Sequence, residues 1–270
     1  MTMIKLRTLF IAVVLVLTAC ATTTRPGVVG VDRQQLLLVS AADVERIANV
    51  YYVQQYNKAK SQGHLVTEGE ELNRLKKIGG RLISQTSVFR DDARQWKWNL
   101  TLIDAPVLNA SCAPGGKITF FTGIIRQLNL TDDEIAAIMG HEIAHALREH
   151  GREKVSQAVA QNLITTVALA ATQDKEREIQ AANQIAYYLF VLPNSRVDET
   201  EADRIGIELA ARAGYNPSAA VNVWRKMAAA TRGNTPPQFL STHPSHSTRI
   251  SDISALLPKV MPLYQAAQKP

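Results

Sequence analysis

The stretch His141-Glu142-Ile143-Ala144-His145 constrains this chain more than any other feature of its sequence. Residues four apart share a helix face, so both imidazoles can bind one metal ion. Glu142, next to the first histidine, can then reach a water molecule on that metal and take its proton, as in zinc peptidases. An ordinary core helix with two histidines is the alternative, and the flanking sequence decides against it.

The residues before this stretch predict the start of a buried helix. Thr131-Asp132-Asp133-Glu134 has the pattern of a capping box, and its acidic residues suit the positive end of a helix dipole. The turns that follow are apolar on several sides, which indicates a central position in the domain. The apolar residues are Ile135, Ile138, Met139, Ile143, Ala146 and Leu147.

A catalytic zinc takes three protein ligands and keeps a fourth position for water, so the chain needs a third ligand. Glu199-Thr200-Glu201-Ala202-Asp203 offers candidates on a helix whose start is signalled by Pro193 and Asn194. Glu199 and Asp203 share one face of that helix, whereas Glu201 lies about 160° away around the axis. The spacing therefore allows one of the two glutamates, and not both, to face the metal.

Together the two motifs resemble the zinc metallopeptidases of the HtpX, BepA and LoiP type, peptidase family forty-eight, which includes the CAAX prenyl protease. The resemblance covers about residues 65–255. It implies an α+β, mainly helical zincin fold of the gluzincin type, with a small β-sheet beside the metal helix. Further matching segments are Asn109-Ala110, Pro114-Gly115-Gly116-Lys117-Ile118, Thr122-Gly123, Ala213-Gly214-Tyr215-Asn216-Pro217 and Ser241-Thr242-His243-Pro244.

The resemblance assigns roles to individual residues. It implies one zinc ion per chain held by His141, His145 and Glu199, with Glu142 as the base and Asp203 as a second functional group near the metal. We expect Asp203 to orient a ligand histidine, or to donate to the reaction intermediate.

Two further site predictions concern the substrate and regulation. By resemblance, Asn109 and Ala110 are candidates for a strand that pairs with the substrate, and a purely structural hairpin is the alternative. His243 is a candidate regulatory zinc ligand that shuts the site, with helix capping or substrate binding equally open. His64 and His150 have no motif around them and are expected at the surface. Arg196 and Arg249 are weaker candidates for transition-state or carboxylate contacts, and a structural role is the alternative for each.

The first 19 residues read as a lipoprotein signal peptide. Two basic residues precede an apolar run that is too short for a membrane span, and Leu17-Thr18-Ala19-Cys20 resembles a lipobox. A plain secretory signal is the alternative. Lipidation of Cys20 leaves Cys112 as the sole thiol, without an internal disulfide. Because Ala21 is not Asp, we expect an outer-membrane anchor facing the periplasm, a lipidated tether over residues 20–40 and the peptidase domain over 41–262.

The remaining pattern predicts the other elements of the domain. Helices are expected over residues 41–62 and 70–86, and strands near 98–102, 107–110 and 117–121 with a turn at 114–116. Residues 151–190 are an insertion, expected to form a helical hairpin or a mobile flap. Residues 241–246 are expected to form a loop, followed by a helix that starts near residue 247.

Charge and composition limit the classes of partner. Without the signal peptide the chain has 28 basic and 24 acidic residues, a net charge of +4, and no basic cluster with interleaved aromatic residues, so nucleic-acid binding is not expected. The expected substrates are misfolded or unassembled envelope proteins. The alternative function is a periplasmic chaperone or assembly factor for outer-membrane proteins, linked to their assembly machinery, with proteolysis secondary. A structural zinc protein is disfavoured because only Cys112 would be available as a thiol ligand.

Overall fold

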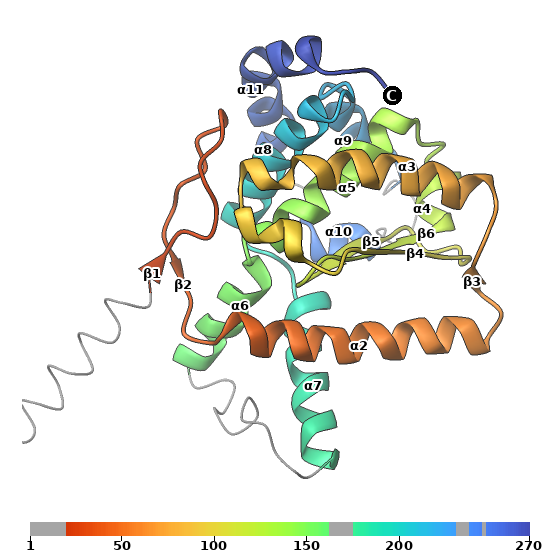
Figure 1. Cartoon of the computed structure of the whole chain (residues 1–270), viewed down its shortest axis with the longest axis vertical. Coiled ribbons are helices and arrows are strands. Elements are labelled where there is room, and N and C mark those ends of the chain that lie inside the picture. The colour runs from red at the N-terminus through yellow and green to blue at the C-terminus, as the bar shows by residue number, and fades with distance from the viewer. Residues whose placement is uncertain (1–19, 162–174, 231–237, 245–246) are drawn as a thin grey trace, which may run out of the picture.

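A computed structural model describes residues 20–161, 175–230, 238–244 and 247–270. A four-stranded sheet in the order β3-β4-β6-β5 forms the middle of the domain. Helices α3 and α5 cover one face of this sheet, and α2 runs along the other (Figure 1). The predicted α+β, mainly helical class with a small sheet beside the metal helix is therefore confirmed.

The sheet is mixed. β3 pairs antiparallel with β4, β4 pairs parallel with β6, and β5 pairs antiparallel with β6 as the edge strand. A second, two-stranded sheet joins β1 and β2 near the N-terminus. The strands are β1 Cys20–Ala21, β2 Gln35–Leu36, β3 Leu65–Val66, β4 Asn99–Ile103, β5 Ala110–Ala113 and β6 Lys117–Phe121.

The helices begin where capping and turn residues predict. Thr131 and Ser195 cap α5 and α8 with complete capping boxes. The helices are α2 Ala41–Ser61, α3 Glu70–Gln85, α4 Thr122–Gln127, α5 Asp132–Leu147, α6 His150–Ala160, α7 Lys175–Phe190, α8 Arg196–Arg212, α9 Ala219–Ala230, α10 Gln238–Thr242 and α11 Ser247–Ala266. Short 3-10 helices cover Thr86–Val88 and Asp91–Gln95.

Two sequence predictions are corrected here. The strand expected over 107–110 begins only at Ala110, where Asn109 Oδ1 accepts from the Ala110 N–H, and it continues to the turn at 114–116. The loop expected over 241–246 is partly helical, because α10 extends to Thr242. The insertion at 151–190 contains α6 and α7, and the centre of the predicted hairpin or flap, 162–174, lies outside the described residues.

Helices α5 and α8 cross in close contact at Gly140 and Gly206. A Cβ atom on Gly140 would lie 2.8 Å from the Gly206 carbonyl oxygen, and a Cβ atom on Gly206 would lie 2.8 Å from the His141 nitrogen. The two backbones are therefore in direct contact at this point. Every α5 residue from Glu134 to Leu147 is buried, so the crossing lies inside the core.

The first part of the predicted lipidated tether packs against the domain. Within residues 20–36, Val29 and Val31 are each 3% exposed and belong to the main core, and Gln35 is fully buried. Glu208 of α8 accepts from the backbone N–H groups of Val28 and Val29. We call residues 20–36 the N-terminal segment. In the described part of the chain, no helix has both the length and the apolar character that a membrane crossing requires.

Candidate active site

Four side chains that could bind a metal converge at the α5–α8 crossing. His141 and His145 lie one turn apart on α5, Glu199 lies in the first turns of α8, and His243 directly follows α10. One donor atom from each lies within 4.8 Å of the other three, and none of the four residues is more than 8% exposed. The structure thus brings the three predicted metal ligands together with His243, the candidate regulatory ligand.

The spacing of these donors fits a tetrahedral metal site. His145 Nε2 lies 3.0 Å from His141 Nε2 and 3.4 Å from Glu199 Oε1. His243 Nδ1 lies 3.2 Å from His141 Nε2 and 2.9 Å from Glu199 Oε1. Bonds of about 2.0–2.1 Å around a tetrahedral ion place neighbouring ligand atoms about 3.3 Å apart. The donor set of two or three imidazoles and one carboxylate suits zinc.

Asp203 and Arg249 surround the ligands from the α8 side. Asp203 Oδ1 lies 3.0 Å from His141 Nδ1, so a hydrogen on Nδ1 leaves Nε2 free for the metal. Arg249 donates to both Asp203 oxygens at 2.7 Å and to Glu199 Oε2 at 2.6 Å, and its guanidinium lies 3.6 Å from the centre of the Trp224 ring. Arg249 therefore fixes both carboxylates.

These contacts keep the two carboxylates ionised. Burial raises the pKa of Asp203, but the Arg249 charge and the His141 hydrogen bond outweigh burial and lower it. Burial likewise raises the pKa of Glu199, and the neighbouring imidazoles, His243 first, hold it well below its ordinary value. Charged carboxylates are the form that can bind a cation and orient a histidine.

Glu142 lies where a catalytic base belongs. Its Oε1 atom is 3.3 Å from His243 Nε2, yet this buried oxygen accepts no well-aligned hydrogen bond from the described residues. Burial raises the pKa of Glu142 above its ordinary value. A raised pKa and an unsatisfied oxygen beside the donor cluster suit a group that takes a proton from water and gives it up again.

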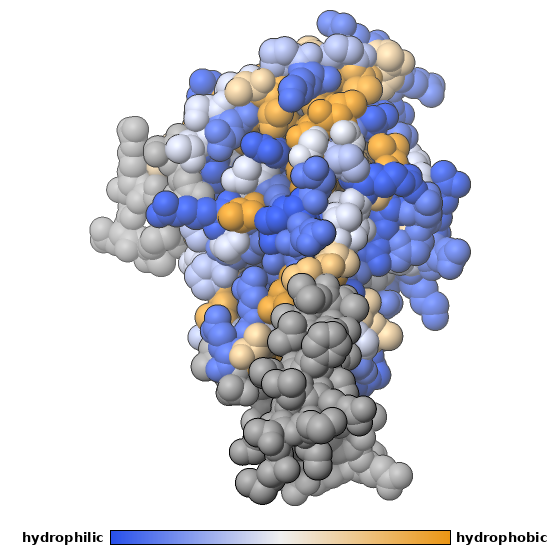
Figure 2. Space-filling model, turned by 90° about the vertical axis from the view of Figure 1, so that its left-hand side faces the viewer, coloured by the Kyte–Doolittle hydropathy of each residue, from blue (hydrophilic) through white to orange (hydrophobic). Residues whose placement is uncertain are grey.

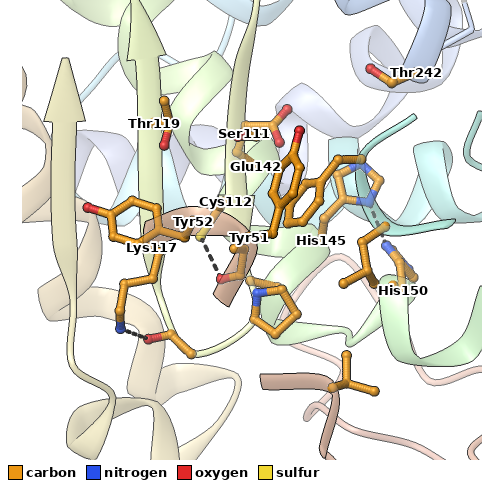
Figure 3. A pocket seen from close by; sticks show the side chains of 18 of the residues that line it. Tyr51, Tyr52, Ser111, Cys112, Lys117, Thr119, Glu142, His145, His150 and Thr242 are labelled. Atoms are coloured by element: carbon orange, nitrogen blue, oxygen red, sulfur yellow. Dashed lines mark hydrogen bonds between the residues drawn. The ribbon is translucent and has the colours of Figure 1, made fainter. Parts of the chain in front are cut away.

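A cleft of about 310 Å³ leads to this site between β5, α2 and α7 (Figure 3). Asn109 and Ala110 both line it. The Phe121 N–H donates to the Asn109 carbonyl, so the backbone of Asn109 faces β6. By the alternation of an antiparallel pair, Ala110 and Cys112 then direct their backbone groups to the open edge of the sheet. The Asn109 carbonyl is thus paired within the sheet, and the role of Asn109 and Ala110 in substrate binding stays a prediction.

Some other positions depart from the sequence expectations, and one agrees with them. His150, expected at the surface, is 1% exposed, and its Nδ1 lies 2.8 Å from His145 Nδ1. Arg249, ranked as a weak candidate, contacts two site carboxylates, whereas Arg196 is exposed and makes none of these contacts. Glu201 points away from the metal as its helix position predicts, and binds Arg33, Arg148 and His150. The sequence carries no motif that marks His150 or Arg249.

The helix crossing, the donor set and the buried base define a metallopeptidase domain. The chain belongs to peptidase family M48, whose sequence pattern matches residues 70–257. The family resemblance and the metallopeptidase class expected from the sequence are therefore confirmed.

Several known proteins are similar to parts of this chain. It is 35% identical over 177 residues to the mitochondrial metalloendopeptidase OMA1 of Saccharomyces cerevisiae, covering 63% of this chain and 50% of that protein. It is 23% identical over 218 residues to a beta-barrel assembly-enhancing protease of Yersinia pestis, covering 78% and 43% respectively. A putative protease of the same description from Vibrio cholerae is 31% identical over 160 residues, covering 54% and 31%. The chain thus spans half or less of the length of these relatives.

Proposed function

We propose that this chain is a zinc-dependent endopeptidase. The convergence of His141, His145 and Glu199 next to the buried Glu142 carries the proposal. A zinc ion held by these three ligands would supply a water of lowered pKa and polarise the scissile carbonyl. Glu142 takes the proton of the attacking water and passes it to the leaving amine.

The surrounding residues have supporting roles in this reaction. Asp203 accepts from His141 Nδ1 and holds that ring in the orientation the metal requires. Arg249 keeps Asp203 and Glu199 in place through its three short hydrogen bonds. The Ala110 carbonyl and the outward backbone groups of Cys112 lie on the open edge of β5, where an extended substrate would lie in the cleft as an added strand.

We also propose that the chain acts in the bacterial envelope, anchored to the outer membrane through lipidated Cys20 and facing the periplasm. The lipobox at residues 17–20 and the similarity to beta-barrel assembly-enhancing proteases support this location. Its substrates would be misfolded or unassembled envelope proteins, whose extended segments fit an edge-strand site. Fractionation of cells that express the wild type and Cys20→Ala tests the anchor, because wild-type protein that is freely soluble in the periplasm contradicts it.

The test of the activity is hydrolysis of unfolded casein by the purified chain. Wild-type protein should cleave casein and lose that activity on treatment with a zinc chelator. Glu142→Gln should keep its zinc and lose about 100-fold or more in rate, since it removes the base and retains the ligands. Full activity in zinc-loaded Glu142→Gln would exclude Glu142 as the base.

A further inference from the structure

The end of the metal helix places another histidine against the metal site. α5 ends at Leu147 and α6 begins at His150, and between them Glu149 has a φ of 51°, in the left-handed region. On an unbroken helix His150 would lie about 140° around the axis from His145. The break turns His150 back, so that its Nδ1 lies 2.8 Å from His145 Nδ1 (Figure 3).

The hydrogen-bond partners fix the direction of this contact. His150 Nε2 lies 3.0 Å from Glu201 Oε2, and an ionised carboxylate can only accept, so Nε2 carries the hydrogen. In a neutral His150 ring, Nδ1 then accepts from His145 Nδ1–H. This arrangement leaves the lone pair of His145 Nε2 directed at the other metal ligands. Glu201 and His150 thus orient the His145 ring for metal binding, as Asp203 orients the His141 ring.

The N-terminal segment holds the outer end of this chain of hydrogen bonds. Arg33 Nε donates to Glu201 Oε1 at 2.9 Å, and the two terminal nitrogens of Arg33 bind Glu153 at 2.6 and 2.8 Å. Arg148, fully buried, binds Glu201 Oε2 and also donates to the Arg33 carbonyl at 2.9 Å. Figure 2 shows the mainly hydrophilic face of the molecule on which this segment lies.

We propose that Glu201 and His150 position His145 for metal binding. Arg33 of the N-terminal segment holds Glu201 in place, so the docked segment also supports the position of His145. The inference rests on the zinc site proposed above. Loss of a hydrogen-bond partner of a metal-bound histidine lowers metal affinity by about 10–100-fold. His150 and Arg33 are therefore positioning residues, and neither contacts the reacting atoms.

Zinc affinity of the purified full chain, measured by competition with a chromophoric chelator, tests the role of His150. His150→Ala should weaken zinc binding about 10–100-fold. His150→Gln should recover most of this loss, because its amide oxygen can accept from His145 and its amide nitrogen can donate to Glu201. His64→Ala, which removes an exposed imidazole, is the matched control and should bind zinc like the wild type.

Thermal unfolding of the zinc-free proteins separates positioning from packing. A packing role alone predicts a lower melting temperature for His150→Ala with unchanged zinc affinity, and that result would overturn the proposal. Equal zinc affinities for the Ala and Gln variants, both below the wild type, would also contradict it. A wild-type chain that binds no zinc would refute the proposed function and this inference with it.

A double-mutant cycle tests the contribution of Arg33. Arg33→Met alone should weaken zinc binding several-fold, whereas Arg33→Met added to His150→Ala should have no further effect, because Arg33 acts through the missing imidazole. Independent, additive losses would show that the N-terminal segment does not act on the metal site through His150.

Discussion

The contact between Gly140 and Gly206 gives a quantitative test of how the metal site is built. This contact brings α8, with Glu199 and Asp203, against the metal helix. In Gly206→Ala the new Cβ would lie 2.8 Å from the His141 nitrogen and 3.0 Å from its Cα. Ordinary contact distances are about 3.5–4.0 Å, so α8 must move away by about 0.7 Å. The obstructing atoms are backbone, so no side-chain rotation can relieve the contact.

The expected cost follows from this displacement. Overpacking in a core lowers the free energy of unfolding by about 1–3 kcal/mol, and because Gly206→Ala meets rigid backbone we expect a loss of about 3 kcal/mol. The better helix propensity of alanine offsets about 1 kcal/mol, which leaves a net loss of about 2 kcal/mol in the free energy of unfolding. For a chain of this size that lowers the melting temperature by about 4–8 °C.

The same displacement should weaken zinc binding. Metal–ligand distances tolerate about 0.2 Å, less than the shift imposed on the helix that carries Glu199, so we expect an affinity loss of about 10-fold or more. Circular dichroism and chelator competition measure the two effects. Gly80→Ala is the control, because Gly80 is exposed on α3 and a Cβ there meets no atom within 4 Å. Equal melting temperatures and zinc affinities for the two variants would refute this account of the crossing.

Three further predictions concern the site and its surroundings. Glu199→Gln should release zinc, whereas Glu201→Gln should retain it because the amide oxygen still accepts from His150; atomic emission on the dialysed proteins checks both. Since His243 Nδ1 lies among the metal donors, His243→Ala should raise casein cleavage, and reduced cleavage by the folded variant would favour substrate binding instead. Burial raises the pKa of Glu201, but hydrogen bonds from His150 and Arg33 outweigh burial and lower it to about 2. Ionised Glu201 therefore stabilises the folded protein fully above about pH 4.5, and this contribution is lost as the pH falls towards 2. Acid unfolding of the zinc-free Glu201→Gln protein should therefore depend less steeply on pH than that of the wild type.

The sequence alone determined the parts of the site that lie within one turn of a helix. The i, i+4 spacing on a helix is fixed by its geometry, so it placed His141 with His145 and Glu199 with Asp203, and it turned Glu201 away. Local capping chemistry likewise fixed where α5 begins, since Thr131 and Glu134 need only each other to complete the box. The choice of Glu199 over Glu201 came from the family resemblance.

Tertiary structure decided everything that depends on how distant segments meet. Arg249 lies 50 residues from the glutamate it binds, and only the packing of α11 against α8 brings them together. His150 contacts His145 because Glu149 adopts a left-handed conformation, and since that position is not a glycine, the sequence did not mark it. The sequence of the N-terminal segment is mostly polar, yet two of its valines are buried in the core and Arg33 binds acidic residues on α6 and α8. The sequence of the segment alone does not show that these buried acidic partners lie beside it. Local sequence fixes geometry over one helical turn, whereas burial and charge pairing between segments are properties of the folded chain.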